Sequence, residues 1–400
     1  MNIQRTFRHA PELSQVAPIS AQVLGWFGTL QHAEHWIRQL LARAGVTVDG
    51  DAPWDIQVHD PRFYPRVLRD GTLGLGEAYM DGWWDAERLD DTVARLLRAH
   101  LERAVRENWR LAAQVALAKL SNLQSPKDAR TVAERHYDLG NDFYAAMLDS
   151  RMNYTCAYWK EAETLDAAQE AKLDLVCRKI GLQPGQRVLE LGCGWGAFAK
   201  FAAERYGAEV VGFNISKEQV ASARAQCSGL PVTIHLDDYR NARGQFDAVV
   251  SIGLMEHVGP KNYRAYMELV ERCLAPGGTA FIHTIGGNES SDTLDPWFHT
   301  YVFPNAVLPS LAQITAAAEG LFVIEDVHNI GPHYDTTLMA WLENFESAWP
   351  RFAKTFGERF YRMWKFYLQA SAAGFRARYL QLYQLVLTRR GTQQPLCRQA

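Results

Sequence analysis

The spacing of apolar residues separates a helical N-terminal part from a longer part in which short strands alternate with helices. Apolar residues recur every three to four positions over 33–44 and again over 90–120, which predicts two helices. Between them, 46–58 and the glycine-rich 71–76 are typical of short strands and turns. The sequence therefore predicts a small α+β unit, followed by a polar, proline-containing linker at 121–128.

The second predicted helix carries a basic face. Its arginines fall on one side of the helix and its apolar residues on the other. These are Arg95, Arg98, Arg103, Arg106 and Arg110 against Leu97, Leu101, Ala104 and Val105. Such a helix is typical of membrane surfaces, but a solvated face that packs on its own domain explains the pattern at least as well.

Past the linker, β-rich runs alternate with helical ones. The runs are 187–191, 209–213, 232–236, 246–252, 279–284, 322–327 and 379–388. A long aromatic helical insertion over 336–375 separates the last two. This alternation predicts an α/β fold with a Rossmann-like sheet of seven strands and helices on both faces.

Composition narrows the class of protein. The 400 residues are 48% hydrophobic and 22% charged, as in an ordinary folded globule, and the net charge of −3 provides no strong field for nucleic acid. Six cysteines without a C-x-x-C pair suit reduced thiols in the cytoplasm and no structural metal. No apolar run is typical of a secretion signal or a bilayer-spanning helix, so we expect a cytoplasmic protein.

A glycine-rich loop follows the strand at 187–191. It reads Gly192-Cys193-Gly194-Trp195-Gly196 and leads into a helix over 197–206. Glycines at this point let the backbone approach a ligand, and the helix N-terminus offers free N–H groups. The pattern also fits a dinucleotide site, but the next strand ends in the amide Asn214, where an acid should hold the ribose.

Glu190, which precedes this loop, favours a different ligand. A carboxylate here repels a pyrophosphate but suits a positively charged sulfonium, which favours S-adenosylmethionine as the cofactor. The alternative is that Glu190 only accepts a backbone N–H from the neighbouring loop or helix. One glycine motif does not decide between the two cofactors.

At this point the chain resembles a known family, the cyclopropane-fatty-acyl-phospholipid synthases and their mycolic-acid relatives. The matching segments are HYDLGNDFY (136–144), YTCAYW (154–159), VLELGCGWG (188–196), ISKEQ (215–219), EHVGPKNY (256–263), HTIG (283–286), FPNAVLPS (303–310), HYDTTLMAW (333–341) and FRAR (375–378). Their order covers roughly 130–390. TLGLGEAYMDGWW at 72–84 extends the resemblance into the N-terminal part and favours the phospholipid branch.

The resemblance implies a class I methyltransferase that uses S-adenosylmethionine to methylenate a cis double bond in an unsaturated phospholipid. It also implies a homodimer, peripheral at the inner membrane surface. The residues at the matching cofactor positions are Tyr154, Thr155, Glu190, Gly192, Cys193, Gly194, Gly196, Asn214, Ser216, Gln219, Asp238 and Tyr239. Among them, Gln219 is the expected ribose partner.

Relatives in the family hold a bicarbonate ion as the base. The matching residues are Cys156, Glu256, His283, Ile285 and Tyr334. Glu256, His283 and Tyr334 would orient the anion, and Ile285 would donate its backbone N–H. Glu256 and His283 follow predicted strands, so both should lie at the carboxyl edge of the sheet. Alternatively, His283 is a structural hydrogen-bonding group, Glu256 only caps a helix, and Cys156 is a nucleophile.

The division of the chain follows from these expectations. We expect a lipid-binding or dimerisation domain at 1–120, a linker at 121–130 and a catalytic domain at 131–400, with 296–318 and 336–375 lining an acyl-chain tunnel. Two alternative functions stay open. The enzyme could form a methyl-branched or methylene product, or the protein could bind lipid without catalysis.

Overall fold

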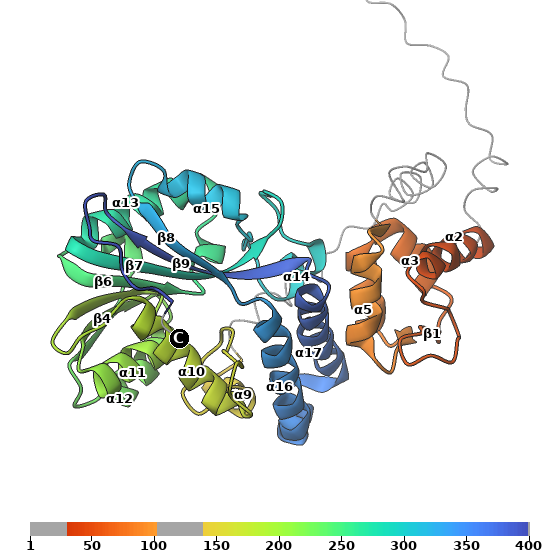
Figure 1. The fold of residues 1–400 in the computed structure, drawn as a ribbon. Coiled ribbons are helices and arrows are strands. Elements are labelled where there is room, and N and C mark those ends of the chain that lie inside the picture. Colours follow the sequence, from red (N-terminus) through yellow and green to blue (C-terminus); the bar gives the residue numbers. More distant parts are fainter. Residues whose placement is uncertain (1–29, 102–138, 399–400) are drawn as a thin grey trace, which may run out of the picture.

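The computed structural model describes residues 30–101 and 139–398. Its centre is a seven-stranded sheet in the order β5-β4-β3-β6-β7-β9-β8 (Figure 1). The strands from β5 to β7 pair in parallel, and β9 runs antiparallel between β7 and β8. The bounds are β3 (Arg187–Leu191), β4 (Glu209–Asn214), β5 (Val232–Leu236), β6 (Phe246–Ile252), β7 (Leu274–Gly287), β8 (Val323–Asn329) and β9 (Leu380–Thr388). All seven strands were predicted from the sequence.

Helices cover both faces of this sheet (Figure 1). One face carries α10 (Leu165–Lys179), α11 (Ala197–Tyr206) and α12 (Lys217–Gln226), and the other carries α13 (Tyr263–Cys273) and α15 (Leu311–Ala318). β3 (RVLEL) is buried from its second residue onward, which is typical of a strand covered on both faces. The predicted α/β class is confirmed.

The aromatic insertion forms two helices rather than the single helix expected over 336–375. They are α16 (Pro332–Ala348) and α17 (Ala353–Arg376), joined by the 3₁₀ turn η4 (Trp349–Arg351). Pro350 lacks the N–H that a continuous helix would need, and Gly357 has a φ of 74° inside α17. Both helices stand beside the sheet, next to the short helix α9 (Asn141–Met147) (Figure 1).

Many aromatic side chains of this region form core. Phe143 of α9 has ring centroids at 5.1–6.0 Å in edge contacts with Phe345, Phe352, Phe356, Phe360 and Trp364. Contacts of this kind stabilise beyond the area they bury. The high aromatic content therefore serves packing first, and only some of the rings are available for a site.

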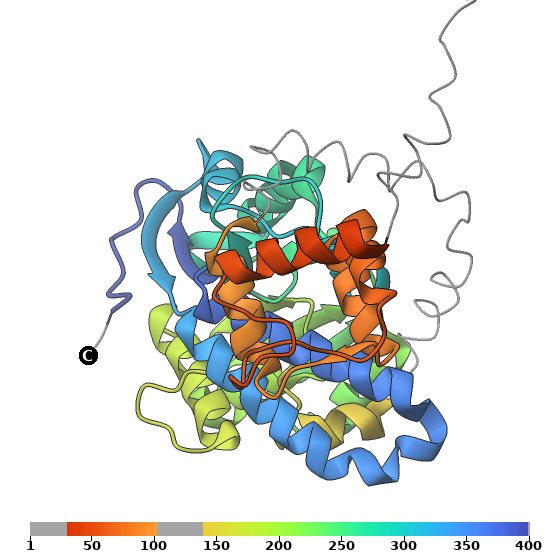
Figure 2. The ribbon, with the colours of Figure 1, turned by 90° about the vertical axis from the view of Figure 1, so that its right-hand side faces the viewer.

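The N-terminal part forms a small unit that packs on α17 (Figures 1 and 2). It contains α2 (Leu30–Arg43), β1 (Gln57–Val58), α3 (Phe63–Asp70), α4 (Thr72–Met80), β2 (Trp84–Asp85) and α5 (Leu89–Arg98). β1 and β2 pair antiparallel. The prediction of strands and turns at 71–76 is wrong, because this segment begins α4.

The glycines of α4 explain that error. A Cβ at Gly74 would lie 2.5 Å from the Arg66 carbonyl oxygen, and one at Gly76 would lie 2.4 Å from the Trp297 ring. Both glycines therefore permit close packing of α4 against α3 and against α14 (Pro296–Tyr301). Only Gly71, with a φ of 60°, serves a turn.

The basic helix predicted over 90–120 also differs from the structure. α5 ends at Arg98, and His100 follows with a φ of 47°, so the segment is not one continuous helix. Arg95 stacks on the Trp54 ring at 3.7 Å, and Arg98 donates to the Arg376 carbonyl oxygen. Both arginines thus contact the protein itself. Arg103, Arg106, Arg110 and the linker at 121–130 lie outside the described residues.

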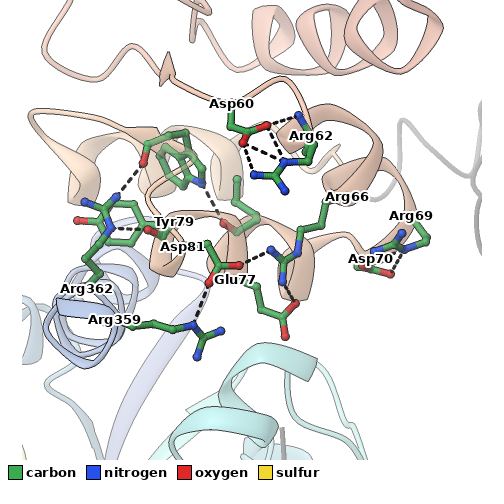
Figure 3. Close-up of polar contacts among 12 residues, drawn as sticks. Asp60, Arg62, Arg66, Arg69, Asp70, Glu77, Tyr79, Asp81, Arg359 and Arg362 are labelled. Carbon is green, nitrogen blue, oxygen red and sulfur yellow. Dashed lines mark hydrogen bonds and ion pairs between the residues drawn. The ribbon is translucent and has the colours of Figure 1, made fainter. Parts of the chain in front are cut away.

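Ion pairs and backbone contacts attach the N-terminal unit to α17 (Figure 3). Arg359 pairs with Asp81 at 2.9 Å, and Arg362 donates to the Tyr79 carbonyl oxygen and to Asp85. Further along α17, Arg376 pairs with Asp90 at 2.5 Å, with Asp91 at 2.7 Å and with Asp335 of α16 at 2.8 Å. The predicted division into domains stays a prediction.

Across residues 30–101 and 139–398, no helix combines the length and the apolar character that crossing a bilayer requires.

Candidate active site

The glycine loop joins β3 to α11 in the conformation that its sequence predicts. Gly192, Gly194 and Gly196 have φ values of 75°, 52° and 83°, which residues with a Cβ rarely adopt. Asn214, at the end of β4, donates from Nδ2 to the Gly194 carbonyl oxygen at 3.0 Å and to Gln219 Oε1 at 2.8 Å. The amide that argued against a dinucleotide therefore holds the loop in place.

The other predicted cofactor residues follow the next strand ends. Ser216 caps α12 by accepting from the Gln219 N–H. Asp238 caps the 3₁₀ turn η1 (Tyr239–Asn241), and the Tyr239 ring contacts Tyr266 at 6.0 Å. Asn214, Ser216 and Gln219 thus form one connected group at the carboxyl edge, while Asp238 and Tyr239 lie after the neighbouring strand β5.

Neither cysteine of the predicted site has the surroundings of a nucleophile. Cys156 is fully buried, and burial raises the pKa of its thiol well above the usual value. Burial raises the pKa of Cys193 in the same way, and its Sγ would lie 3.0 Å from a Cβ at Gly212. Both thiols therefore stay protonated, and Cys193 is a small packing residue.

Glu190 is buried at 4% exposure beneath the glycine loop. Burial raises the pKa of its carboxyl, while Lys172 and the Ala199 N–H lower it. The contact with Ala199 agrees with the alternative that Glu190 accepts a backbone N–H. However, Glu190 Oε2 has no hydrogen-bond partner within the described part of the chain. One oxygen is therefore available to a cationic ligand.

Lys172 is a candidate site residue that was not predicted from the sequence. It lies on α10 at 1% exposure, and its Nζ donates to Asn153 Oδ1 at 3.0 Å and to Thr155 Oγ1 at 2.9 Å. Burial lowers the pKa of this amine, opposed by Asp149, Cys156 and Glu190 nearby. Lys172 therefore binds the segment that carries Tyr154 and Thr155, and its charge also acts on the Glu190 carboxyl. A charged residue on the core-facing side of a helix was the available signal.

Glu256 follows the end of β6, and His283 lies within β7, opposite Ile252 at the last position of β6. Glu256 lies in the 3₁₀ turn η2 (Met255–His257), and its Oε1 accepts the Ile285 N–H at 2.7 Å. Among the described residues, Glu256 Oε2 and His283 Nε2 are buried without a hydrogen-bond partner. Ile285 thus orients the Glu256 carboxyl, and its predicted donation to an anion stays a prediction.

Tyr334 and Cys156 complete the predicted group. Burial raises the pKa of the Tyr334 hydroxyl well above its usual value, and Tyr367, Cys156 and Glu256 nearby raise it further. Burial lowers the pKa of His283 well below its usual value, and Lys172 and Lys179 add to this effect. The phenol and the neutral imidazole are therefore hydrogen-bond donors at neutral pH.

Aromatic rings pack around Tyr334 of this group. Tyr154 lies 5.2 Å from Trp341 and donates or accepts a 2.8 Å hydrogen bond with the Tyr367 hydroxyl. Tyr334 lies 4.7 Å from Phe375 and 5.9 Å from Trp341. Ring faces attract a nearby cation, so the site can stabilise positive charge without a carboxylate in contact with it.

The burial of Glu256 predicts a measurable dependence of stability on pH. Its carboxyl pKa rises from 4.5 to about 7, so the folded protein keeps a proton that the unfolded chain loses. Wild-type stability should therefore fall between about pH 4.5 and 7 relative to Glu256→Gln, by up to about 3 kcal/mol. Thermal unfolding of both proteins at pH 5 and pH 8 measures this difference. If the two proteins differ in stability by the same amount at both pH values, the Glu256 carboxyl does not have a raised pKa.

Among the described residues, no three His, Cys, Asp or Glu side chains gather closely enough to hold a metal ion.

Comparison with known proteins identifies the family. The family model of mycolic acid cyclopropane synthetase matches residues 124–385. The chain is 51% identical over 359 residues to cyclopropane-fatty-acyl-phospholipid synthase of Escherichia coli (strain K12), which covers 89% of this chain and 94% of that protein. The chain belongs to this family. Membership confirms the resemblance found in the sequence and the predicted class of S-adenosylmethionine-dependent methyltransferases.

Two further relatives of the cyclopropane synthetase family bear on the reaction. Tuberculostearic acid methyltransferase UfaA1 of Mycobacterium tuberculosis is 35% identical over 347 residues, covering 82% of this chain and 81% of that protein. The solved structure of mycolic acid cyclopropane synthase CmaA1, complexed with SAH and CTAB, has a TM-score of 0.59 and 32% identity. It covers 65% of this chain and 98% of that structure.

Proposed function

We propose that this protein transfers a methylene group from S-adenosylmethionine to the cis double bond of an unsaturated phospholipid, with bicarbonate as the base. The observation that carries the proposal is the pair of buried, unpartnered atoms, Glu256 Oε2 and His283 Nε2, noted above among the described residues. Buried polar atoms without partners cost free energy unless a ligand satisfies them. Their place at the carboxyl edge of the sheet is where open α/β folds bind ligands.

The cofactor fits the glycine loop. Glu190 Oε2 is a buried carboxyl oxygen without a partner among the described residues, and a bound cation would favour its charged form, while the positive φ values of the loop allow close approach of the backbone. Gln219, held by Asn214, is the proposed ribose partner. When bound, S-adenosylmethionine supplies an activated methyl group that an olefin can attack.

The bicarbonate proposal rests on the hydrogen-bond donors of the site. The Nε2–H of neutral His283, the Tyr334 hydroxyl and, when protonated, the Glu256 carboxyl can each donate to an anion. Since the pKa of Glu256 is raised to about 7, a carboxyl proton is available near neutral pH. A bound bicarbonate would supply the base that removes one proton from the transferred carbon, so that the ring can close.

The surrounding rings suit the charge of such a reaction. Tyr154, Trp341, Tyr334 and Phe375 contact one another in one group, and aromatic faces stabilise a carbocation. They also exclude water, which would trap the cation as an alcohol. The predicted acyl-chain tunnel stays a prediction. Its first predicted segment, 296–318, contributes to two different places. α15 packs on α13 over the sheet, while Phe298 and Phe303 lie near Tyr367.

The test incubates the protein with vesicles of cis-unsaturated phospholipid, S-adenosylmethionine and bicarbonate. We expect a mass gain of one methylene per modified chain, and slower turnover in buffer stripped of carbon dioxide. A lipid of unchanged mass would refute the proposal. Full activity without bicarbonate would remove the anion from the mechanism.

A second function is favoured by one observation, the similarity to tuberculostearic acid methyltransferase UfaA1. In this alternative the same methyl transfer ends in a methyl-branched or methylene product. NMR of the product lipid distinguishes the two, because only a cyclopropane gives strongly upfield methylene protons. A lipid-binding protein without catalysis is the third possibility, and calorimetric failure to bind S-adenosylmethionine would favour it.

A phospholipid substrate implies contact with a bilayer, and we propose that this contact is peripheral. Arg95 and Arg98 make contacts within the protein, so they do not by themselves form a membrane-binding face. The homodimer and the place at the inner membrane surface remain predictions from the resemblance.

A further inference from the structure

Gln384 lies directly beside His283 in the sheet. The two residues are opposite each other in the antiparallel β7–β9 ladder, and both are buried, at 0% and 1% exposure. Gln384 Nε2 lies 3.3 Å from His283 Nδ1. Side chains of paired residues extend from the same face of a sheet, so this contact is imposed by the register of the strands.

The contact determines which ring nitrogen carries the proton. In this orientation of the amide, Gln384 Nε2 faces Nδ1, and because an amide nitrogen can only donate, His283 Nδ1 accepts. A neutral imidazole has a single proton, which must then be on Nε2. Within the described residues, this Nε2 is buried without a partner, and its N–H is therefore free to donate to a ligand.

We propose that Gln384 is a positioning residue that holds His283 in the Nε2–H tautomer and so prepares the site for an anion. The inference rests on the proposed function for its chemical purpose. With the opposite tautomer, the Nε2 lone pair would face the negative charge of bicarbonate and repel it. With this tautomer, His283 Nε2 donates to the anion.

The ladder also places a second imidazole beside Gln384, whose Oε1 is buried without a hydrogen-bond partner among the described residues. On its other side, Gln384 pairs with His328 of β8. Burial lowers the pKa of His328 to about 4, and Lys179 and Arg398 add to this effect, so the ring is neutral. The amide is thus flanked by two uncharged imidazoles. The cross-strand row therefore consists of His283, Gln384 and His328, and it contains no carboxylate that would favour a second proton on His283.

The test reads the tautomer directly. The full-length protein is labelled with ¹⁵N-histidine, and the ring nitrogens of His283 are assigned by their absence in His283→Gln. We expect a protonated Nε2 and an unprotonated Nδ1 in the wild type. In Gln384→Glu the carboxylate can only accept, so Nδ1 should gain a proton.

Activity measurements connect the tautomer to catalysis. Gln384→Glu should lower kcat about a hundredfold, the usual effect of losing one preorganised donor, with a much smaller change in KM for S-adenosylmethionine. Gln384→Met, which keeps the size of the side chain, should give mixed tautomers and a smaller loss of kcat. Gln384→Met also provides the test if Gln384→Glu does not fold.

Gln381→Glu is the matched control. Gln381 is also buried on β9, but its amide contacts Asn288, Asn329 and Arg378 instead of a histidine. Its variant should leave the His283 signals unchanged.

The proposal is overturned if wild-type His283 carries its proton on Nδ1, or if both Gln384 variants keep the wild-type tautomer. A wild type with the expected tautomer that forms no product from lipid would instead refute the proposed function.

Discussion

Glu256→Gln should lower kcat about a hundredfold while the affinity for S-adenosylmethionine stays within a factor of two. The carboxyl has one oxygen held by the Ile285 N–H and the other buried without a partner among the described residues. Gln keeps the shape and the contact with Ile285, but it cannot exchange a proton with a bound anion. Losses of this size are typical when a group that handles protons is removed.

Two measurements separate this effect from damage to the fold. Single-turnover rates report the chemical step, and calorimetry with S-adenosylmethionine reports the cofactor site around Glu190. Because Gln is neutral, the variant should be at least as stable as the wild type at pH 8. Near-normal kcat in Glu256→Gln would remove this residue from the mechanism.

The sheet was predictable because its strands are local patterns. β3 (RVLEL) and β6 (FDAVVSI) are short, mostly apolar segments of five and seven residues, which is typical of strands buried on both faces. The same reasoning places Glu256 after the end of β6, whereas His283 lies within β7, opposite the last residue of β6. Their role in a common site stays a prediction.

The errors and omissions share a physical cause, which is dependence on distant partners. Gly76 signals a turn locally, but its purpose is contact with Trp297. Gln384 is an ordinary strand residue until β9 places it beside His283, 101 positions away. Pro350, by contrast, was a local signal for the end of α16, and the aromatic pattern on both sides of it concealed the break.

Lys172→Met should raise the dissociation constant of S-adenosylmethionine about ten- to a hundredfold. Hydrogen bonds from a charged donor contribute about 1.5–3 kcal/mol each, and tenfold in affinity corresponds to about 1.4 kcal/mol. The variant loses two such bonds, to Asn153 and Thr155. Because both bonds join parts of the protein and not the cofactor, we expect only about half of their free energy to affect the affinity. Asn153 and Thr155, on either side of Tyr154, then lose their bonds to α10, and Glu190 loses its neighbouring cation.

Lys179→Met provides the matched control on the same helix. Lys179 is also 1% exposed, but it pairs with Asp326 at 2.7 Å on β8. Both variants remove a buried ammonium group and leave its polar partners without their donor, so both should unfold at lower temperature than the wild type. Only Lys172→Met should weaken cofactor binding in calorimetry below its unfolding temperature. Equal losses of affinity in the two variants would make the effect one of stability, and Lys172 would then have no particular role in the site.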